Sequence, residues 1–184
     1  LVAAERGVLR TDPLGEVGGE GGDGVAGGGD GFGEGGRDLI GGWLADNGVL
    51  DFAGGVPVEM ASGFSAFAAA IVVGARKDFG RLADVPHNAL FILLGVGLLW
   101  FGWMGFNGGS GFSVGSPSIL AVANTLLAPA CTLVMWFIFD LLRGRKVTAV
   151  GAATAIVVGC VGITPAAGLI SPTWAMALGA LAAI

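Results

Sequence analysis

Residues 51–77 read DFAGGVPVEMASGFSAFAAAIVVGARK. Between Asp51 and the basic pair Arg76 and Lys77, the stretch carries one charged residue, Glu59. A helix needs about 20 mostly apolar residues to cross the hydrocarbon core of a bilayer. The stretch therefore predicts a membrane-spanning helix that starts near Asp51, ends near Gly74 and holds a single carboxylate.

The chain beyond this helix repeats the pattern of long apolar runs separated by short turns. We expect an uncharged loop at 107–118, before the third span. A second uncharged loop is expected before a final, truncated segment from Thr173 to Ile184. The sequence thus predicts an all-α integral membrane fold, a partial bundle of about four complete transmembrane helices plus a truncated one. The three spans that follow the first are expected at about 88–106, 119–142 and 147–164.

The basic residues test this topology independently. All six Lys and Arg residues after Arg37 lie in two loops, 75–87 and 143–146. Two helices separate these loops, so both lie on one side of the membrane, which the positive-inside rule makes cytoplasmic. Asp51 and residues 106–110 then lie near the outer face of the cell membrane. The chain has no basic face that would suit nucleic acid.

The first 38 residues differ from the rest. Residues 15–36 are mostly Gly with scattered Glu and Asp, a composition that cannot bury enough apolar surface to fold alone. Gly31, Gly33 and Gly36 fit a dinucleotide-binding pattern, but no apolar strand precedes them, which disfavours a soluble nucleotide-binding enzyme. Gly18–Ala26 fits one calcium-binding nonapeptide, but the next nine residues break the repeat. We expect a disordered linker or an out-of-frame translation, separate from the helical membrane domain at 39–184.

Several side chains are expected to serve helix packing in lipid. Asn124 and Thr125 could form hydrogen bonds across helices, and Cys131 and Cys160 are typical of small buried apolar residues. Small residues that would permit close backbone approach are Ala68, Ala69, Gly74, Gly151, Ala152, Gly159 and Gly162.

Several motifs follow one another along the chain: Gly48-Val-Leu, Asp51 through Gly63, Gly74-Ala-Arg, Pro86-His-Asn, Gly102-Trp-Met-Gly-Phe-Asn-Gly-Gly-Ser110 and Gly162-Ile-Thr-Pro-Ala166. In this order they resemble the ammonium transporter (Amt/Mep/Rh) family. The resemblance covers about Gly41 to Ile184 and leaves the Gly-rich first 38 residues outside. Its main departure is Glu59, at a position where the family typically carries the first of two pore histidines and some fungal members carry a carboxylate.

The resemblance implies a bundle of eleven helices built from two inverted halves, usually trimeric, with a narrow pore through each protomer. On that template the chain runs from the end of the fourth helix into the ninth, so we expect an incomplete piece of a transporter; it also begins with Leu1 rather than Met. The family allows a nitrogen-regulatory signalling protein to dock on the cytoplasmic loops. It implies no enzyme activity, no cofactor and no metal.

Two roles can be inferred for Asp51. As the residue before an apolar helix it suits an N-cap, whose carboxylate accepts hydrogen bonds from the first backbone N–H groups. The resemblance places an essential Asp here, near the outer pore mouth, where it would help to favour a cation. We favour the structural role over direct contact with the ion, and both can hold at once.

A stripe of side chains on the second span suggests a pore wall. Trp103, Phe106, Asn107 and Ser110 stand at helical spacing on one face. Such a stripe is usually packing, but its polar members favour a pore. The resemblance implies that Phe106 gates the outer vestibule and that Ser110 belongs to the ammonium recruitment site, and it adds Thr164 to the pore. Ring faces attract a cation and a hydroxyl accepts its N–H.

Glu59 is the candidate proton acceptor. A carboxylate in a membrane span is costly, so it should face the bundle interior and is functional by default. It could accept the proton shed by ammonium while neutral ammonia passes. The alternative is a tolerated substitution in a decaying gene.

Other family positions are altered or lie outside the chain. His87, the single histidine, falls in a predicted cytoplasmic loop, and Leu39 stands where the family often carries a vestibule Trp. The second pore histidine would lie beyond Ile184. The sequence predicts part of an ammonium or ammonia transporter, with a non-transporting membrane fragment or a degenerate gene product as the alternative.

Overall fold

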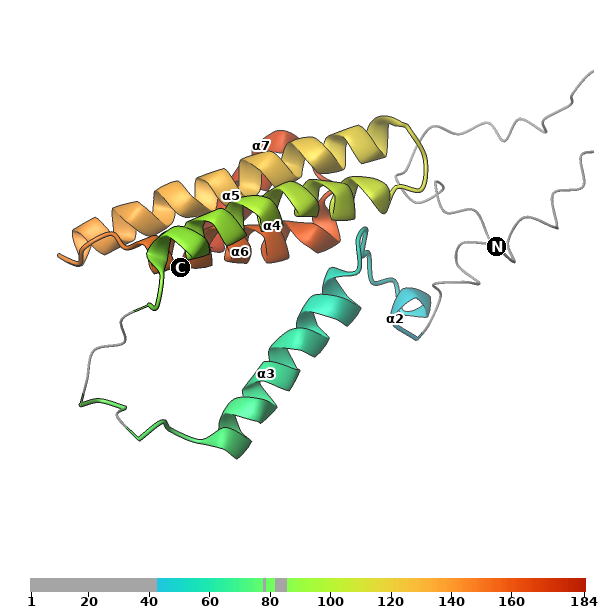
Figure 1. Cartoon of the computed structure of the whole chain (residues 1–184). Helices are drawn as coiled ribbons and strands as arrows, with labels where there is room; N and C mark the ends of the chain where they lie inside the picture. The colour runs from blue at the N-terminus through green and yellow to red at the C-terminus, as the bar shows by residue number, and fades with distance from the viewer. Residues whose placement is uncertain (1–42, 78, 82–85) are drawn as a thin grey trace, which may run out of the picture. The chain divides into compact units, whose positions relative to one another are not determined.

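The structure is a computed structural model that describes residues 43–77, 79–81 and 86–184. In this part of the chain every regular element is helical (Figure 1). The elements are α2 (Trp43–Asp46), η1 (Gly55–Glu59), α3 (Met60–Val73), α4 (Ala89–Gly109), α5 (Ser116–Leu142), α6 (Ala149–Ile163), η2 (Thr164–Ala166) and α7 (Pro172–Leu181).

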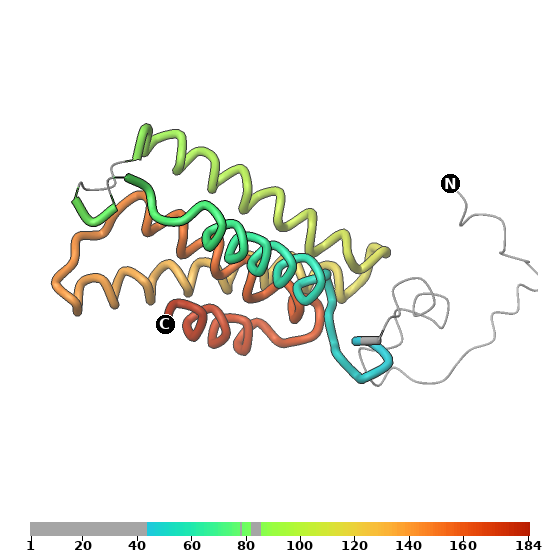
Figure 2. The backbone as a smooth tube through the Cα atoms, turned by 90° about the horizontal axis from the view of Figure 1, so that it is seen from below, coloured from blue at the N-terminus to red at the C-terminus, as the bar shows by residue number. Residues whose placement is uncertain are grey.

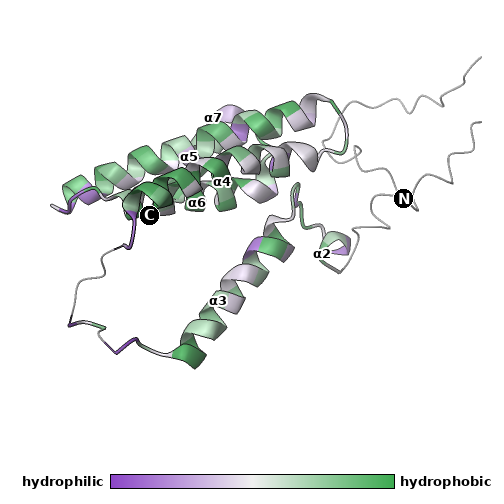
Figure 3. Ribbon diagram, in the orientation of Figure 1, coloured by the Kyte–Doolittle hydropathy of each residue, from purple (hydrophilic) through white to green (hydrophobic). Residues whose placement is uncertain are grey.

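Four helical segments are long and apolar enough to cross a membrane, so the chain is a multi-pass membrane protein of the predicted all-α class. Figure 3 shows mostly apolar residues along these helices and hydrophilic residues in the segments after α3 and between α5 and α6. Helix α7, which follows the four spans, has 10 residues and matches the predicted truncated segment. The spans are Gly55–Val73, Ala89–Gly109, Ser116–Leu142 and Ala149–Ala166.

The predicted helix boundaries are wrong in three places. The first span begins with the π-helical turn η1 at Gly55, not at Asp51, because Asp51 caps the turn from outside. The second span continues to Gly109, so Asn107 lies inside α4 rather than in a loop. The third begins at Ser116, where Pro117 fits the first turn of a helix because its missing N–H is not needed there.

Helices α4 to α7 pack side by side (Figure 2). Two apolar clusters hold them together. The first joins Phe52 and Ala53 to α5, α6 and α7, and the second joins Val96 of α4 to α6. Helix α3, in contrast, contributes no buried residue. Its apolar surface suits contact with lipid or with another helix.

Two glycines inside α6 and α7 allow close approach of the backbone of α5. A Cβ at Gly159 would lie 2.5 Å from Pro129 Cα, and a Cβ at Gly179 would lie 2.2 Å from the carbonyl oxygen of Ala128. Gly159 confirms the small-residue prediction and Gly179 adds to it. Gly74, which ends α3 with open space around it, and the exposed alanines of α3 make no such approach among the described residues.

Candidate substrate pathway

The Asp51 carboxylate caps the N-terminal end of the first span. Its Oδ1 accepts hydrogen bonds from the N–H groups of Gly54 at 3.0 Å and Gly55 at 2.9 Å, and its Oδ2 accepts one from Val56 at 2.8 Å. These groups belong to the helix end whose N–H groups have no intrahelical partner. The expected capping role is therefore confirmed, and it fixes a negative charge at this end of the span.

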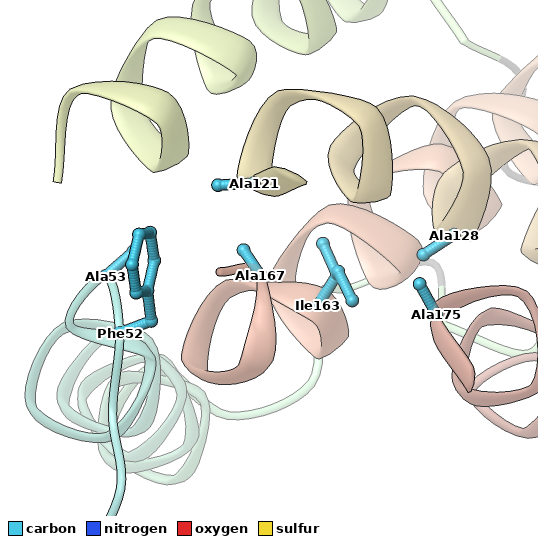
Figure 4. Packing of buried hydrophobic residues seen from close by; sticks show 7 residues of the cluster. All are labelled: Phe52, Ala53, Ala121, Ala128, Ile163, Ala167 and Ala175. Carbon is cyan, nitrogen blue, oxygen red and sulfur yellow. The ribbon is translucent and has the colours of Figure 1, made fainter. Parts of the chain in front are cut away.

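The segment that carries Asp51 is attached to the turn after α6. The N–H of Phe52 donates to the carbonyl oxygen of Pro165 at 2.8 Å. The Phe52 ring is buried in the cluster that includes Ala121 of α5 and Ala167 (Figure 4). These contacts place the start of the first span directly against η2, which begins at Thr164.

Trp103 connects α4 to the same turn. Its Nε1–H donates to Thr164 Oγ1 at 2.8 Å, and the Thr164 hydroxyl donates to the carbonyl oxygen of Cys160 at 2.7 Å. The Trp103 ring meets the Phe106 ring edge to face, with centroids 6.0 Å apart and planes at 66°. Thr164 is fully buried, whereas Phe106 is 43% exposed. The pair therefore has one anchored ring and one accessible ring.

Ser110 and Asn107 have different surroundings. Ser110 Oγ donates to the carbonyl oxygen of Phe106 at 2.8 Å, and the side chain is half-buried at the end of α4. Asn107 is fully buried, and its Nδ2 donates to Thr125 Oγ1 of α5 at 2.9 Å. Its Oδ1 has no hydrogen-bond partner among the described residues. Asn107 therefore serves helix pairing and keeps one free buried acceptor.

Glu59 is the last residue of η1 and is half-buried. Element η1 contacts α6, in which Cys160 is fully buried, and it also contacts η2. The Cys160 carbonyl in turn accepts the Thr164 hydroxyl. Glu59 thus approaches the same part of α6 that Trp103 reaches from α4.

The structure brings three separate segments together here. The Asp51 segment, α4 and η2 meet through the carbonyl of Pro165 and the side chains of Trp103 and Thr164. Among the described residues, no group of three or more His, Cys, Asp or Glu side chains could hold a metal ion. His87 is exposed. Leu39 lies outside the described residues.

Sequence reasoning missed the roles of Trp100 and Pro129. A proline inside a helix lacks the N–H that would bond the carbonyl four residues earlier, here that of Thr125. Trp100 Nε1 supplies the missing donor, at 2.8 Å from this carbonyl oxygen. A proline at position 129 within an apolar run indicates that the Thr125 carbonyl lacks its helical donor. No sequence pattern indicates which residue supplies another donor.

The cross-helix expectation for Asn124 and Thr125 is confirmed. Thr125 accepts from Asn107, as described, and Asn124 Nδ2 donates to the carbonyl oxygens of Ala167 at 2.8 Å and Ile170 at 2.7 Å. Both residues are fully buried. They hold α5 to α4 and to the segment between α6 and α7, and so fix the frame around Trp103 and Thr164.

The chain resembles named transporters over most of its length. It is 44% identical to ammonium transporter 2 of Schizosaccharomyces pombe over 141 residues, which cover 76% of the chain and 28% of the relative. It is 40% identical to the ammonium transporter of Bacillus subtilis over 139 residues, covering 76% of the chain and 34% of the relative. The chain therefore spans about a third of the length of these relatives.

The fold is shared with solved structures. The crystal structure of Candida albicans Mep2 matches with a TM-score of 0.72 and 41% identity, covering 77% of the chain and 32% of that structure. A structure described as a sensor Amt protein matches with a TM-score of 0.72 and 39% identity, covering 76% and 36%. The family model described as "Ammonium Transporter Family" matches residues 34–184, starting a few residues before the expected boundary. The chain therefore belongs to the ammonium transporter family.

Proposed function

We propose that this chain forms part of a protein that transports ammonium or ammonia across the membrane. The observation that carries the proposal is the junction at Thr164. There the Trp103 indole of α4 bonds to Thr164, the N–H of Phe52 bonds to the Pro165 carbonyl, and η1, which ends at Glu59, contacts the same short turn. The named relatives are ammonium transporters.

The outer end of the pathway would recruit the cation. The exposed face of Phe106 can attract ammonium, and the Ser110 hydroxyl can accept one of its N–H groups. The Asp51 carboxylate keeps a negative charge nearby, although its oxygens already bind three backbone N–H groups. Its contribution would therefore be electrostatic, with no direct contact to the ion.

Glu59 would accept the proton. The N–H bond of ammonium breaks, its proton passes to a Glu59 carboxylate oxygen, and neutral ammonia continues along the span. The carboxylate has no hydrogen-bond partner among the described residues that would compete with this role.

The family resemblance supports three further proposals. The whole protein would form a homotrimer in the cell membrane, and loops 75–87 and 143–146 would face the cytoplasm, where both gather basic residues. A nitrogen-regulatory signalling protein would dock on this face.

A chimera tests the proposed function. Residues 48–184 replace the matching segment of the Schizosaccharomyces pombe ammonium transporter 2, and the product is expressed in cells that lack their own ammonium uptake. We expect growth on low ammonium, and loss of growth with Glu59→Ala. A chimera that reaches the membrane at the parent's level but supports no growth would favour the non-transporting alternative.

A further inference from the structure

The turn that follows α6 holds the start of the first span through two close packing contacts. Gly55 is buried, and a Cβ there would lie 2.8 Å from Pro165 N and 2.9 Å from Pro165 Cγ. A Cβ at Gly168 would lie 2.6 Å from Phe52 Cδ2. Real Cβ atoms essentially never come so close to another residue, so neither glycine admits a side chain unless its neighbour shifts. The hydrogen bond from the Phe52 N–H to the Pro165 carbonyl oxygen, at 2.8 Å, joins the same two segments.

Pro165 is the rigid half of this contact. Its ring fixes φ and leaves the residue few other backbone conformations. The preceding residue, Thr164, is fully buried, accepts a hydrogen bond from Trp103 and donates one to the Cys160 carbonyl oxygen. Because Pro165 is held in this way, a side chain at Gly55 would displace η1 rather than the turn.

Glu59 stands at the other end of the element that Gly55 begins. Element η1 runs from Gly55 to Glu59 as one π-helical turn, and the Asp51 carboxylate ties its first backbone N–H groups together. Helix α3, which continues from Glu59, contributes no buried residue of its own among those described, whereas η1 contacts both α6 and η2. The place of Glu59 in the described part of the chain therefore depends on how Gly55 sits against Pro165. Such π turns are frequent at functional sites.

We infer that Pro165 is a positioning residue for proton transfer to Glu59, acting through its contacts with Gly55 and Phe52. The inference rests on the proposed function, in which ammonium gives its proton to the Glu59 carboxylate. Such a transfer needs about 2.6–3.2 Å between the heavy atoms, and a displacement of about 1 Å can lower a rate about a hundredfold. A Cβ at Gly55 would have to move by about 0.5 Å to reach ordinary contact with Pro165 Cγ. The displaced turn would carry Glu59 with it.

Ammonium flux through the chimera that carries residues 48–184, reconstituted in liposomes and normalised to the amount of inserted protein, tests this role. Gly55→Ala should lower the maximal flux about tenfold. It should leave the half-saturating ammonium concentration within about twofold, because the recruiting side chains Phe106 and Ser110 lie at the end of α4. Gly63→Ala is the matched control: it adds the same methyl group to the same span, where no described atom lies within 4 Å of the new Cβ. It should change neither quantity by more than about twofold.

A second substitution tests whether Gly55→Ala acts through Pro165. Pro165→Ala removes the Cγ and Cδ atoms that a Cβ at Gly55 would meet, and it keeps the carbonyl oxygen that accepts from Phe52. In the Pro165→Ala background, Gly55→Ala should therefore lower the maximal flux only about threefold. An equal loss in both backgrounds would overturn the inference, because it would show that the added methyl group acts at another place.

Hydrogen exchange of the whole chain in detergent separates this inference from the proposed function. Gly55→Ala should speed exchange of the Phe52 amide about tenfold, because it loosens the bond to Pro165, whereas Gly63→Ala should not. Fast exchange with wild-type flux would overturn the inference, since Pro165 would then hold the segment without positioning Glu59. Unchanged exchange and unchanged flux would also overturn it. An unmodified chimera without flux would contradict the proposed function, and the positioning role would fall with it, whereas the exchange result would stand.

Discussion

Replacing Trp100 with Phe should destabilise the pairing of α4 and α5 by an amount that depends on Pro129. Trp100 Nε1 donates to the Thr125 carbonyl oxygen at 2.8 Å, and Pro129 lacks the N–H that would otherwise bond this carbonyl. Leaving a buried carbonyl without a partner costs about 1–3 kcal/mol. We therefore expect Trp100→Phe to lower the free energy of unfolding by about 2 kcal/mol, including the smaller apolar surface of Phe.

Pro129→Ala restores a backbone donor for the same carbonyl. In that background Trp100→Phe should cost about 1 kcal/mol less, because the carbonyl keeps a helical hydrogen bond. Unfolding of the four single and double variants in mixed micelles with rising dodecyl sulfate, followed by circular dichroism, measures this coupling. An equal cost of Trp100→Phe in both backgrounds would refute the assignment of Trp100 as the replacement donor.

Three further variants test the Asp51 cap, the close contact of α7 with α5 and the hydrogen bond from Trp103 to Thr164. Asp51→Asn should speed the hydrogen exchange of the Val56 amide. A carboxamide has one oxygen, which can accept from the N–H groups of Gly54 and Gly55 but not from that of Val56 as well. Unchanged exchange would contradict the capping geometry. Gly179→Ala should lower the free energy of unfolding by about 3 kcal/mol, since its Cβ would lie 2.2 Å from the Ala128 carbonyl oxygen, and wild-type stability would show that the helices are not in close contact. Thr164→Val should cost about 1–2 kcal/mol by removing the indole's acceptor, and a smaller cost in denaturation would argue against that hydrogen bond.

The spans and the capping role of Asp51 could be predicted because they depend on local chemistry. A long apolar run with one charge predicts a transmembrane helix, and an Asp before it predicts a cap. The π-helical start at Gly55 was not predicted, since both turn types share the same apolar composition. Asn107 was misplaced in a loop because the glycines after it are typical of turns, whereas α4 continues through them.

The contacts between distant segments could not be predicted from the sequence. The bond from Trp103 to Thr164 joins residues 61 positions apart, and the donor for the Thr125 carbonyl lies 25 positions away. Helical spacing placed Trp103, Phe106, Asn107 and Ser110 on one face, but it did not show that Asn107 is buried against α5. Such choices depend on which helices are neighbours, and many side chains in each span could serve as partners.

Ammonium flux is the most direct test of the proposed pathway. The chimera carrying residues 48–184 is purified and placed in liposomes that hold a pH-sensitive dye, and an ammonium gradient is applied. Flux should exceed that of protein-free liposomes, fall strongly with Glu59→Ala, and be retained with Lys146→Gln. Equal flux with and without the Glu59 carboxylate would contradict its role as proton acceptor, and flux no greater than that of protein-free liposomes would contradict the proposed transport function.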